Sequence, residues 1–173
     1  LLNTLKELSN DVFWTDKLLR LKSVRMEDVE FISELFFLVL ENKILDSSQD
    51  VLDDLYDKYC NNVEAVNSAK EEFLNIVHFI SDMSIDFTQL KRLCWTTHLY
   101  SLFSFAWKIS KLGITAKSTK DKIISFYTEY FSKNSIYEGS LKKYKDASSS
   151  RTRSDTQRNN RLMAMMEYCG IKD

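Results

Sequence analysis

The chain has 173 residues, a formal net charge of −1 and 44% hydrophobic residues, a balance typical of a globular domain rather than of a disordered or membrane-spanning chain. It contains three glycines and no proline, too few for the turns of a β-sandwich or barrel or for the glycine-rich loop of a nucleotide-binding α/β fold. We therefore expect an all-α fold, in which residues 1–173 form a single multi-helix bundle of about seven helices without a sheet.

Helical periodicity dominates the N-terminal half of the chain. The residues Leu1, Leu5, Leu8 and Val12 form an apolar stripe that predicts a first amphipathic helix, and residues 18–22 favour a loop or brief turn. A second helix is predicted to begin near Glu27, and its body becomes apolar on all sides, which indicates burial. Two further helices are predicted over residues 51–59 and about 63–81.

In the C-terminal half the pattern over residues 90–95 is compatible with a helix or a short extended piece. Thr96 or Thr97 can cap a fifth helix that ends near Gly113, and Ser118 can cap a sixth that extends to Phe131. A low-hydrophobicity tract follows Gly139 and is expected to be irregular. A last helix then carries residues 162–169 and is closed by a glycine at position 170.

Charge is distributed unevenly along the sequence. Residues 1–86 carry 8 Lys and Arg against 18 Asp and Glu, whereas residues 87–173 carry 16 against 7, which gives net charges of −10 and +9. Such a split indicates either that the two halves complement each other or that the basic half binds an anionic partner.

The cysteines and histidines give no sign of a metal centre. Cys60, Cys94 and Cys169 lie far apart, without a C-x-x-C pair, which excludes a disulfide framework and a zinc site of the usual spacing and favours the reducing cytoplasm. His78 and His98 belong to no metal-binding motif, and we expect both to be partly buried helix residues. We predict no catalytic residue, no cofactor and no metal in this chain.

The strongest functional signal is the basic tract LKKYKDASSSRTRSDTQRNNR, residues 141–161. Its interleaved Ser and Thr hydroxyls can donate hydrogen bonds to phosphate oxygens. An ordinary solvated loop followed by a helix start is the alternative. The predicted nucleic-acid-binding residues are Lys142, Lys143, Arg151, Arg153, Arg158 and Arg161.

One of these cations shares the apolar face of the last helix. Arg158 lies four residues before Leu162 and seven before Met165, so it requires a buried acidic partner or lines a cleft in which an anion binds. The aromatic residues from Trp95 to Trp107 could stack with bases, but their helical spacing among leucines favours a place in the core.

Residues 25–59 read RMEDVEFISELFFLVLENKILDSSQDVLDDLYDKY and carry a resemblance to a known family. The segment is similar to the helical region of GmrSD-type proteins, which are bacterial anti-phage and modification-dependent restriction proteins. The N-terminal NTLKELSNDVFW and the Ser- and Arg-rich stretch before the last helix are also similar, so the resemblance covers most of the chain as a pattern of helices. The matching residues are Arg25, Met26, Asp28 and Glu30 at the opening and Leu52, Asp53 and Tyr56 at the close.

The resemblance implies an upstream N-terminal domain with a ParB/sulfiredoxin-like fold, which carries an Asp-Gly-Gln-Gln-Arg type motif for nucleotide hydrolysis. Neither that motif nor the HNH nuclease motif of some members occurs in this sequence. Because the sequence begins without Met and already in helical rhythm, we expect it to be a fragment that follows the N-terminal domain.

Two functions follow as expectations. By resemblance, the chain is a non-catalytic, DNA-contacting support region of an NTP-dependent DNA endonuclease. The alternative is a helical interaction module that docks the upstream domain or a second subunit. DNA contact requires accessible basic side chains, whereas the interaction module predicts that Arg158 and Arg161 pair with carboxylates.

Overall fold

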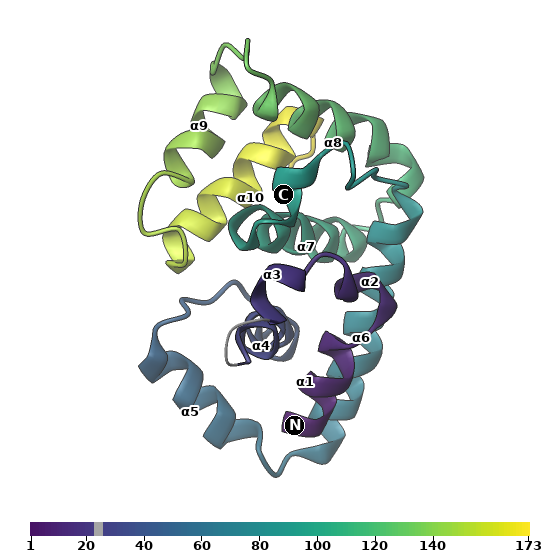
Figure 1. The fold of residues 1–173 in the computed structure, drawn as a ribbon, viewed down its shortest axis with the longest axis vertical. Coiled ribbons are helices and arrows are strands. Elements are labelled where there is room, and N and C mark those ends of the chain that lie inside the picture. Colours follow the sequence, from purple (N-terminus) through teal and green to yellow (C-terminus); the bar gives the residue numbers. More distant parts are fainter. Residues whose placement is uncertain (23–25) are drawn as a thin grey trace. The chain divides into compact units, whose positions relative to one another are not determined.

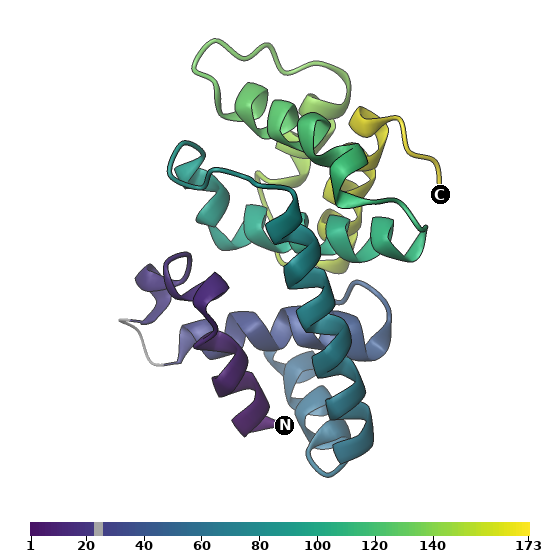
Figure 2. The same cartoon turned by 90° about the vertical axis from the view of Figure 1, so that its right-hand side faces the viewer.

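The structure is a computed structural model that describes residues 1–22 and 26–173. All regular structure in these residues is helical and none of them forms a strand, which confirms the predicted all-α class. The helices form two compact units, Leu1–Val77 and His78–Asp173, which we call the N-terminal and C-terminal units. The boundary falls within α6 (Val63–Asp82), which Figure 2 shows as one unbroken helix.

The N-terminal unit begins with three short helices, and one long helix follows them (Figure 1). No helix in the described part of the chain is long and apolar enough to cross a membrane. Before α6, the helices of the unit are α1 (Leu2–Ser9), α2 (Val12–Thr15), α3 (Leu19–Lys22), α4 (Glu27–Glu41) and α5 (Gln49–Tyr59).

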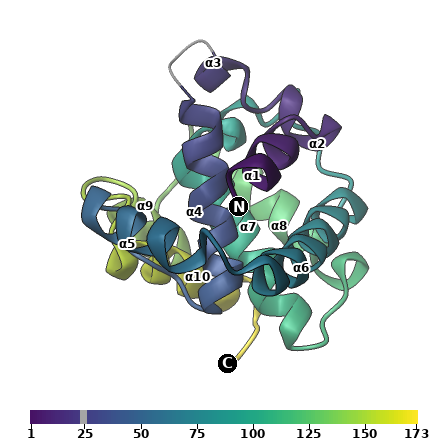
Figure 3. The same ribbon diagram turned by 90° about the horizontal axis from the view of Figure 1, so that it is seen from below.

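Helix α4 lies between α1 and α5, as Figures 1 and 3 show from two directions. Its residues Ile32–Val39 are all buried, which confirms that the apolar stretch is covered on most sides. Aromatic rings hold the unit together: the ring centroids of Trp14 and Phe36 both lie 6.0 Å from that of Phe73. All three side chains are fully buried, so this core is built largely from hydrocarbon.

The predicted end of the first helix is wrong, because α1 ends at Ser9 and does not reach Val12. Asp11 accepts a hydrogen bond from the Phe13 amide and caps a separate helix, α2. Val12 therefore leaves the apolar stripe and is 86% exposed. An aspartate at an N-cap competes with helix continuation, because its carboxylate satisfies an amide that would otherwise lack a partner.

The C-terminal unit is arranged around its last helix, α10, which packs against α7, α8 and α9 (Figure 1). Gly170 ends α10 with φ 70°, a left-handed conformation that glycine adopts without steric cost, so the predicted closure is confirmed. The helical elements are the 3-10 turn η1 (Lys91–Cys94), α7 (Thr96–Lys111), α8 (Ala116–Phe131), α9 (Gly139–Ala147) and α10 (Asp155–Cys169).

Part of the tract expected to be irregular is helical instead. Helix α9 has only Leu141, Tyr144 and Ala147 as buried residues, spaced three apart on one face. Lysines and small residues separate the members of this stripe. The average hydrophobicity of the segment is therefore low and does not indicate a helix.

In α8, Thr115 rather than Ser118 is the N-cap, and the Thr115 hydroxyl accepts from the Ser118 amide.

Candidate nucleic-acid interface

Arg161 is completely buried in the C-terminal unit. Its Nε donates to Ser101 Oγ at 2.8 Å, and its two terminal nitrogens donate to the carbonyls of Ala147 and Thr152 at 2.6 Å each. Ala147 is the last residue of α9, so the guanidinium satisfies a carbonyl that a helix end leaves without an intrahelical partner. Arg161 thus ties α10 to α7, to the end of α9 and to the loop over residues 148–154.

Arg158 is 3% exposed, which confirms that it faces the apolar side of α10. Its guanidinium carbon lies 3.8 Å from the centroid of the Tyr100 ring, a geometry in which the negative face of the ring stabilises the cation. The spacing predicts a carboxylate or a bound anion as the partner of Arg158. It does not predict an aromatic ring.

The predicted nucleic-acid-binding residues therefore divide into two groups. Arg158 and Arg161 lie inside the unit, where a phosphate cannot reach them without a rearrangement of the core. Lys142, Lys143, Arg151 and Arg153 are exposed. Together with the exposed Lys145, these four form what we call the basic surface, on α9 and the loop that follows it.

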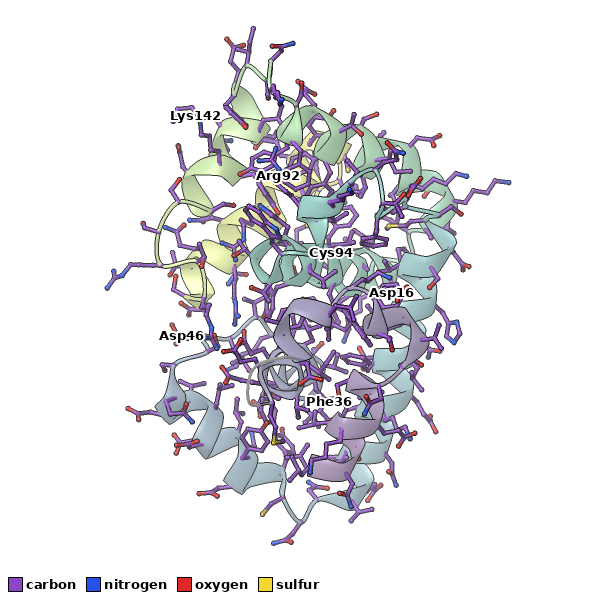
Figure 4. All side chains as sticks on the ribbon, viewed as in Figure 1. Asp16, Phe36, Asp46, Arg92, Cys94 and Lys142 are labelled. Atoms are coloured by element: carbon purple, nitrogen blue, oxygen red, sulfur yellow. The ribbon has the colours of Figure 1, made fainter. Side chains whose placement is uncertain are left out.

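The lysines of the basic surface already have neighbours. Lys142 pairs with Asp146 at 2.6 Å and Lys143 with Glu167 at 2.8 Å, and all four side chains are more than half exposed. Figure 4 marks Lys142 on α9. Solvent-exposed pairs of this kind contribute little to stability, so these ammonium groups can exchange a carboxylate for a phosphate at low cost.

The serines of the tract serve the ends of helices. Ser148 Oγ and Ser149 Oγ donate to the carbonyls of Tyr144 and Lys145 at 2.7 and 2.8 Å. Ser154 is the N-cap of α10, and its hydroxyl accepts from the Gln157 amide. These hydroxyls were expected to donate to phosphate; the structure assigns them to main-chain groups of the turn between α9 and α10.

Behind α9 lies a buried network of rings and hydroxyls. His98 Nδ1 lies 2.9 Å from the Tyr144 hydroxyl, which in turn lies 3.2 Å from the Tyr127 hydroxyl. Burial, together with the nearby guanidinium groups of Arg161 and Arg92, lowers the pKa of His98 to about 4. Burial raises the pKa of both tyrosines. At neutral pH the network therefore holds a neutral imidazole and two protonated phenols.

The two histidines differ in burial. The prediction of a buried helix residue is confirmed for His98, which is 6% exposed, but it is wrong for His78, which is exposed. His78 follows the apolar stripe of α6 by one residue, which turns it away from the buried Val77. Within the residues that the structure describes, no group of three or more His, Cys, Asp and Glu could hold a metal ion.

Cationic side chains complete the ends of three helices in this unit. Arg92 donates to the carbonyl of Phe131 at 2.7 Å, at the end of α8, and Lys122 donates to that of Cys169 at 2.8 Å, at the end of α10. Arg161 does the same for α9. Cations at these positions also meet the negative end of the helix macrodipole. The signal in the sequence is only an excess of Lys and Arg, and it does not say which of them turn inward.

A shallow groove with a volume of about 700 Å³ lies beside the basic surface, between α9 and α10. Its floor includes Met163, which is 50% exposed. Polar groups of both helices surround this apolar side chain. The lining residues are Lys143, Asp146, Ala147, Gln157, Asn160, Met163, Ala164 and Glu167.

The chain matches no protein-family model, no curated protein and no solved structure.

Proposed function

We propose that the C-terminal unit binds the phosphate backbone of DNA through the basic surface, without catalysis of its own. The observation that carries this proposal is the hydrogen bond from Arg161 to the Thr152 carbonyl, which anchors the loop over residues 148–154 between the exposed Arg151 and Arg153. A loop whose backbone is fixed in this way costs less entropy to order when a ligand binds.

The charge of the unit supports the proposal. Residues 78–173 carry 16 Lys and Arg against 9 Asp and Glu, a net charge of +7. Cations that neutralise phosphates release counterions, and this release supplies most of the affinity in binding that is independent of sequence. An excess of positive charge on one unit therefore favours a polyanion as its ligand.

We further propose that the chain is a support region of a GmrSD-type phage-defence protein, next to an upstream catalytic domain. The support is the resemblance alone. Met26 precedes α4, Asp28 and Glu30 lie in its first turn, and the matching residues 52–56 lie on α5. Arg25, the first residue of the match, lies outside the described residues.

The test is fluorescence anisotropy of the chain with a labelled DNA duplex at about 50 and 200 mM salt, where binding through phosphates should weaken steeply. A variant with Lys142, Lys145, Arg151 and Arg153 changed to Ala should bind about tenfold more weakly or worse and show a shallower salt dependence. Arg158 and Arg161 are left in place, because their loss would damage the fold.

The matched control changes four other lysines of the same unit that lie outside the basic surface: Lys117, Lys120, Lys133 and Lys172. If position rather than net charge determines binding, the control variant should lose much less affinity. An absence of duplex binding at low salt would reject the DNA-contacting function, and equal losses in both variants would reject the basic surface as its location.

The groove between α9 and α10 favours a second candidate, a docking module for the upstream domain. A half-exposed methionine surrounded by polar groups is typical of an adaptable contact surface. The methyl NMR signal of Met163 should then shift when the upstream domain is added as a separate chain. An unchanged signal would contradict docking at this groove.

A further inference from the structure

Trp95 lies at the surface, although its spacing predicts a core residue. It is 48% exposed, whereas Trp14 and Trp107 are 0% and 7% exposed. It occupies the N-cap position of α7, directly after the 3-10 turn η1. Trp95 precedes the first helical residue of α7, so the helical spacing of the apolar residues does not place its indole on the buried face.

Trp95 is the outermost ring of a stack that continues into the core. Its ring lies 6.4 Å from that of His98 with an interplanar angle of 25°, and the His98 ring lies 5.6 Å from that of Tyr144 with an angle of 19°. The hydrogen bond between His98 and Tyr144 fixes the middle of the stack. The exposed indole therefore rests on a rigid support, which lowers the cost of adding another flat ring.

Two cations precede the exposed indole in the sequence. Lys91 and Arg92 are exposed on η1, and Figure 4 labels Arg92 and Cys94 on this turn. The Arg92 guanidinium is held by the Phe131 carbonyl at 2.7 Å and lies 4.9 Å from the centroid of the Phe131 ring. Residues 87–120 contain no Asp or Glu, so no acidic residue of this stretch opposes an anion near Trp95.

We propose that Trp95 stacks with an unpaired nucleobase while Lys91 and Arg92 contact the adjacent phosphates. A flat aromatic surface combined with nearby cations is the chemistry that recognises a single-stranded nucleotide. Bases within a duplex already stack on one another and do not offer a free face. This inference rests on the proposed nucleic-acid function and specifies its ligand as DNA with unpaired bases.

The experiment compares a labelled single strand of about 12 nucleotides, a length within the usual site size, with the matching duplex. Anisotropy gives both affinities. A change in tryptophan emission on binding reports on Trp95, because the other two indoles are buried and a bound base cannot contact them. Trp95→Ala should weaken single-strand binding about tenfold, the loss typical of one base stack. Duplex binding should stay nearly unchanged, and Trp95→Phe should retain most of the single-strand affinity.

The matched control is Ile136→Ala, which removes another exposed apolar side chain of the same unit, 73% exposed, without affecting the stack. The wild-type chain should show quenched emission with the single strand, and Trp95→Phe should not. Thermal unfolding of each variant checks that it is folded.

The outcomes separate the two proposals. If the duplex binds, either unquenched emission with the single strand or full single-strand affinity in Trp95→Ala would overturn the stacking proposal and leave the DNA-contacting function intact. No binding of either DNA at low salt would overturn both. Equal losses in Trp95→Ala and Trp95→Phe would also contradict stacking, since phenylalanine keeps a ring at this position.

Discussion

The two units build their interiors from different materials. In the N-terminal unit the fully buried side chains of Trp14, Phe36 and Phe73 contact one another as rings in hydrocarbon surroundings. In the C-terminal unit the largest fully buried side chains include Arg161 and Tyr144, and hydrogen bonds connect them to other elements. The first interior is mainly apolar, with a few buried polar side chains such as Ser33 and Glu34, whereas the second also contains a buried arginine that depends on specific acceptors.

This difference affects how much of the positive charge of the C-terminal unit a ligand can contact. Part of the excess of Lys and Arg in the C-terminal unit is internal, since Arg158 and Arg161 are buried. Arg92 and Lys122 are exposed but donate to carbonyls at the ends of helices. Lys108 and Lys120 are half-buried, and the other Lys and Arg residues of the unit are exposed. The net charge of a helical unit therefore overstates the charge that a partner meets.

The largest expected effect is in the hydrocarbon interior. Phe36→Ala should destabilise the chain by about 4 kcal/mol, because it removes a fully buried ring and leaves a cavity. Urea unfolding measures the change. The matched control is Phe87→Ala, which removes the same ring from a half-buried position in the C-terminal unit. If Phe36→Ala cost no more than the control, the description of this core would be wrong.

The corresponding change in the hydrogen-bonded interior is Arg161→Met, which keeps much of the side-chain volume. It removes the donor from Ser101 and from the carbonyls of Ala147 and Thr152, and we expect a loss of about 3 kcal/mol because buried acceptors are left unpaired. Arg153→Met, at an exposed position, is the control. Equal urea midpoints for the two variants would contradict a structural role for Arg161.

Acid should distinguish the two interiors. His98 has a pKa of about 4 in the folded chain against an ordinary 6.5, so between these values the unfolded chain binds a proton that the folded chain does not. Stability is complete above pH 6.5 and falls as the pH decreases toward 4, by up to about 3 kcal/mol. His98→Gln should flatten the pH dependence of urea unfolding, whereas His78→Gln, at an exposed position, should retain it. A slope that survives His98→Gln would assign the effect to other groups.

The smallest expected effect concerns the basic surface. Arg151 has φ 50°, a left-handed conformation that costs most residues about 1 kcal/mol and that asparagine tolerates better. Arg151→Asn should therefore stabilise the fold slightly while weakening duplex binding. Arg153→Asn serves as the control, since it removes the same charge without relieving a left-handed residue. A destabilised Arg151→Asn variant would show that the arginine contributes to the fold.

Much of the fold was predictable, because the helices with wide apolar stripes, such as α4 and α6, have strong periodicity. The sequence did not reveal α9, whose stripe is only Leu141, Tyr144 and Ala147. The sequence also did not separate the buried cations of the basic tract, Arg158 and Arg161, from the exposed ones. Arg161 is internal because its acceptors come from α7 and α9, and Trp95 is exposed because a helix begins there. The burial of Arg161 depends on neighbours distant in sequence, which periodicity does not report.

The three bonds of Arg161 also determine how the loop over residues 148–154 opens. Its donor lies on α10, whereas two of its acceptors are the last residue of α9 and Thr152 within the loop. The loop therefore cannot fray without removing an acceptor from a buried guanidinium, and its opening should be coupled to the undocking of α10. Proteases should cleave this exposed segment only as fast as the C-terminal unit itself unfolds. A DNA ligand held by the loop would then slow the cleavage by stabilising the whole unit.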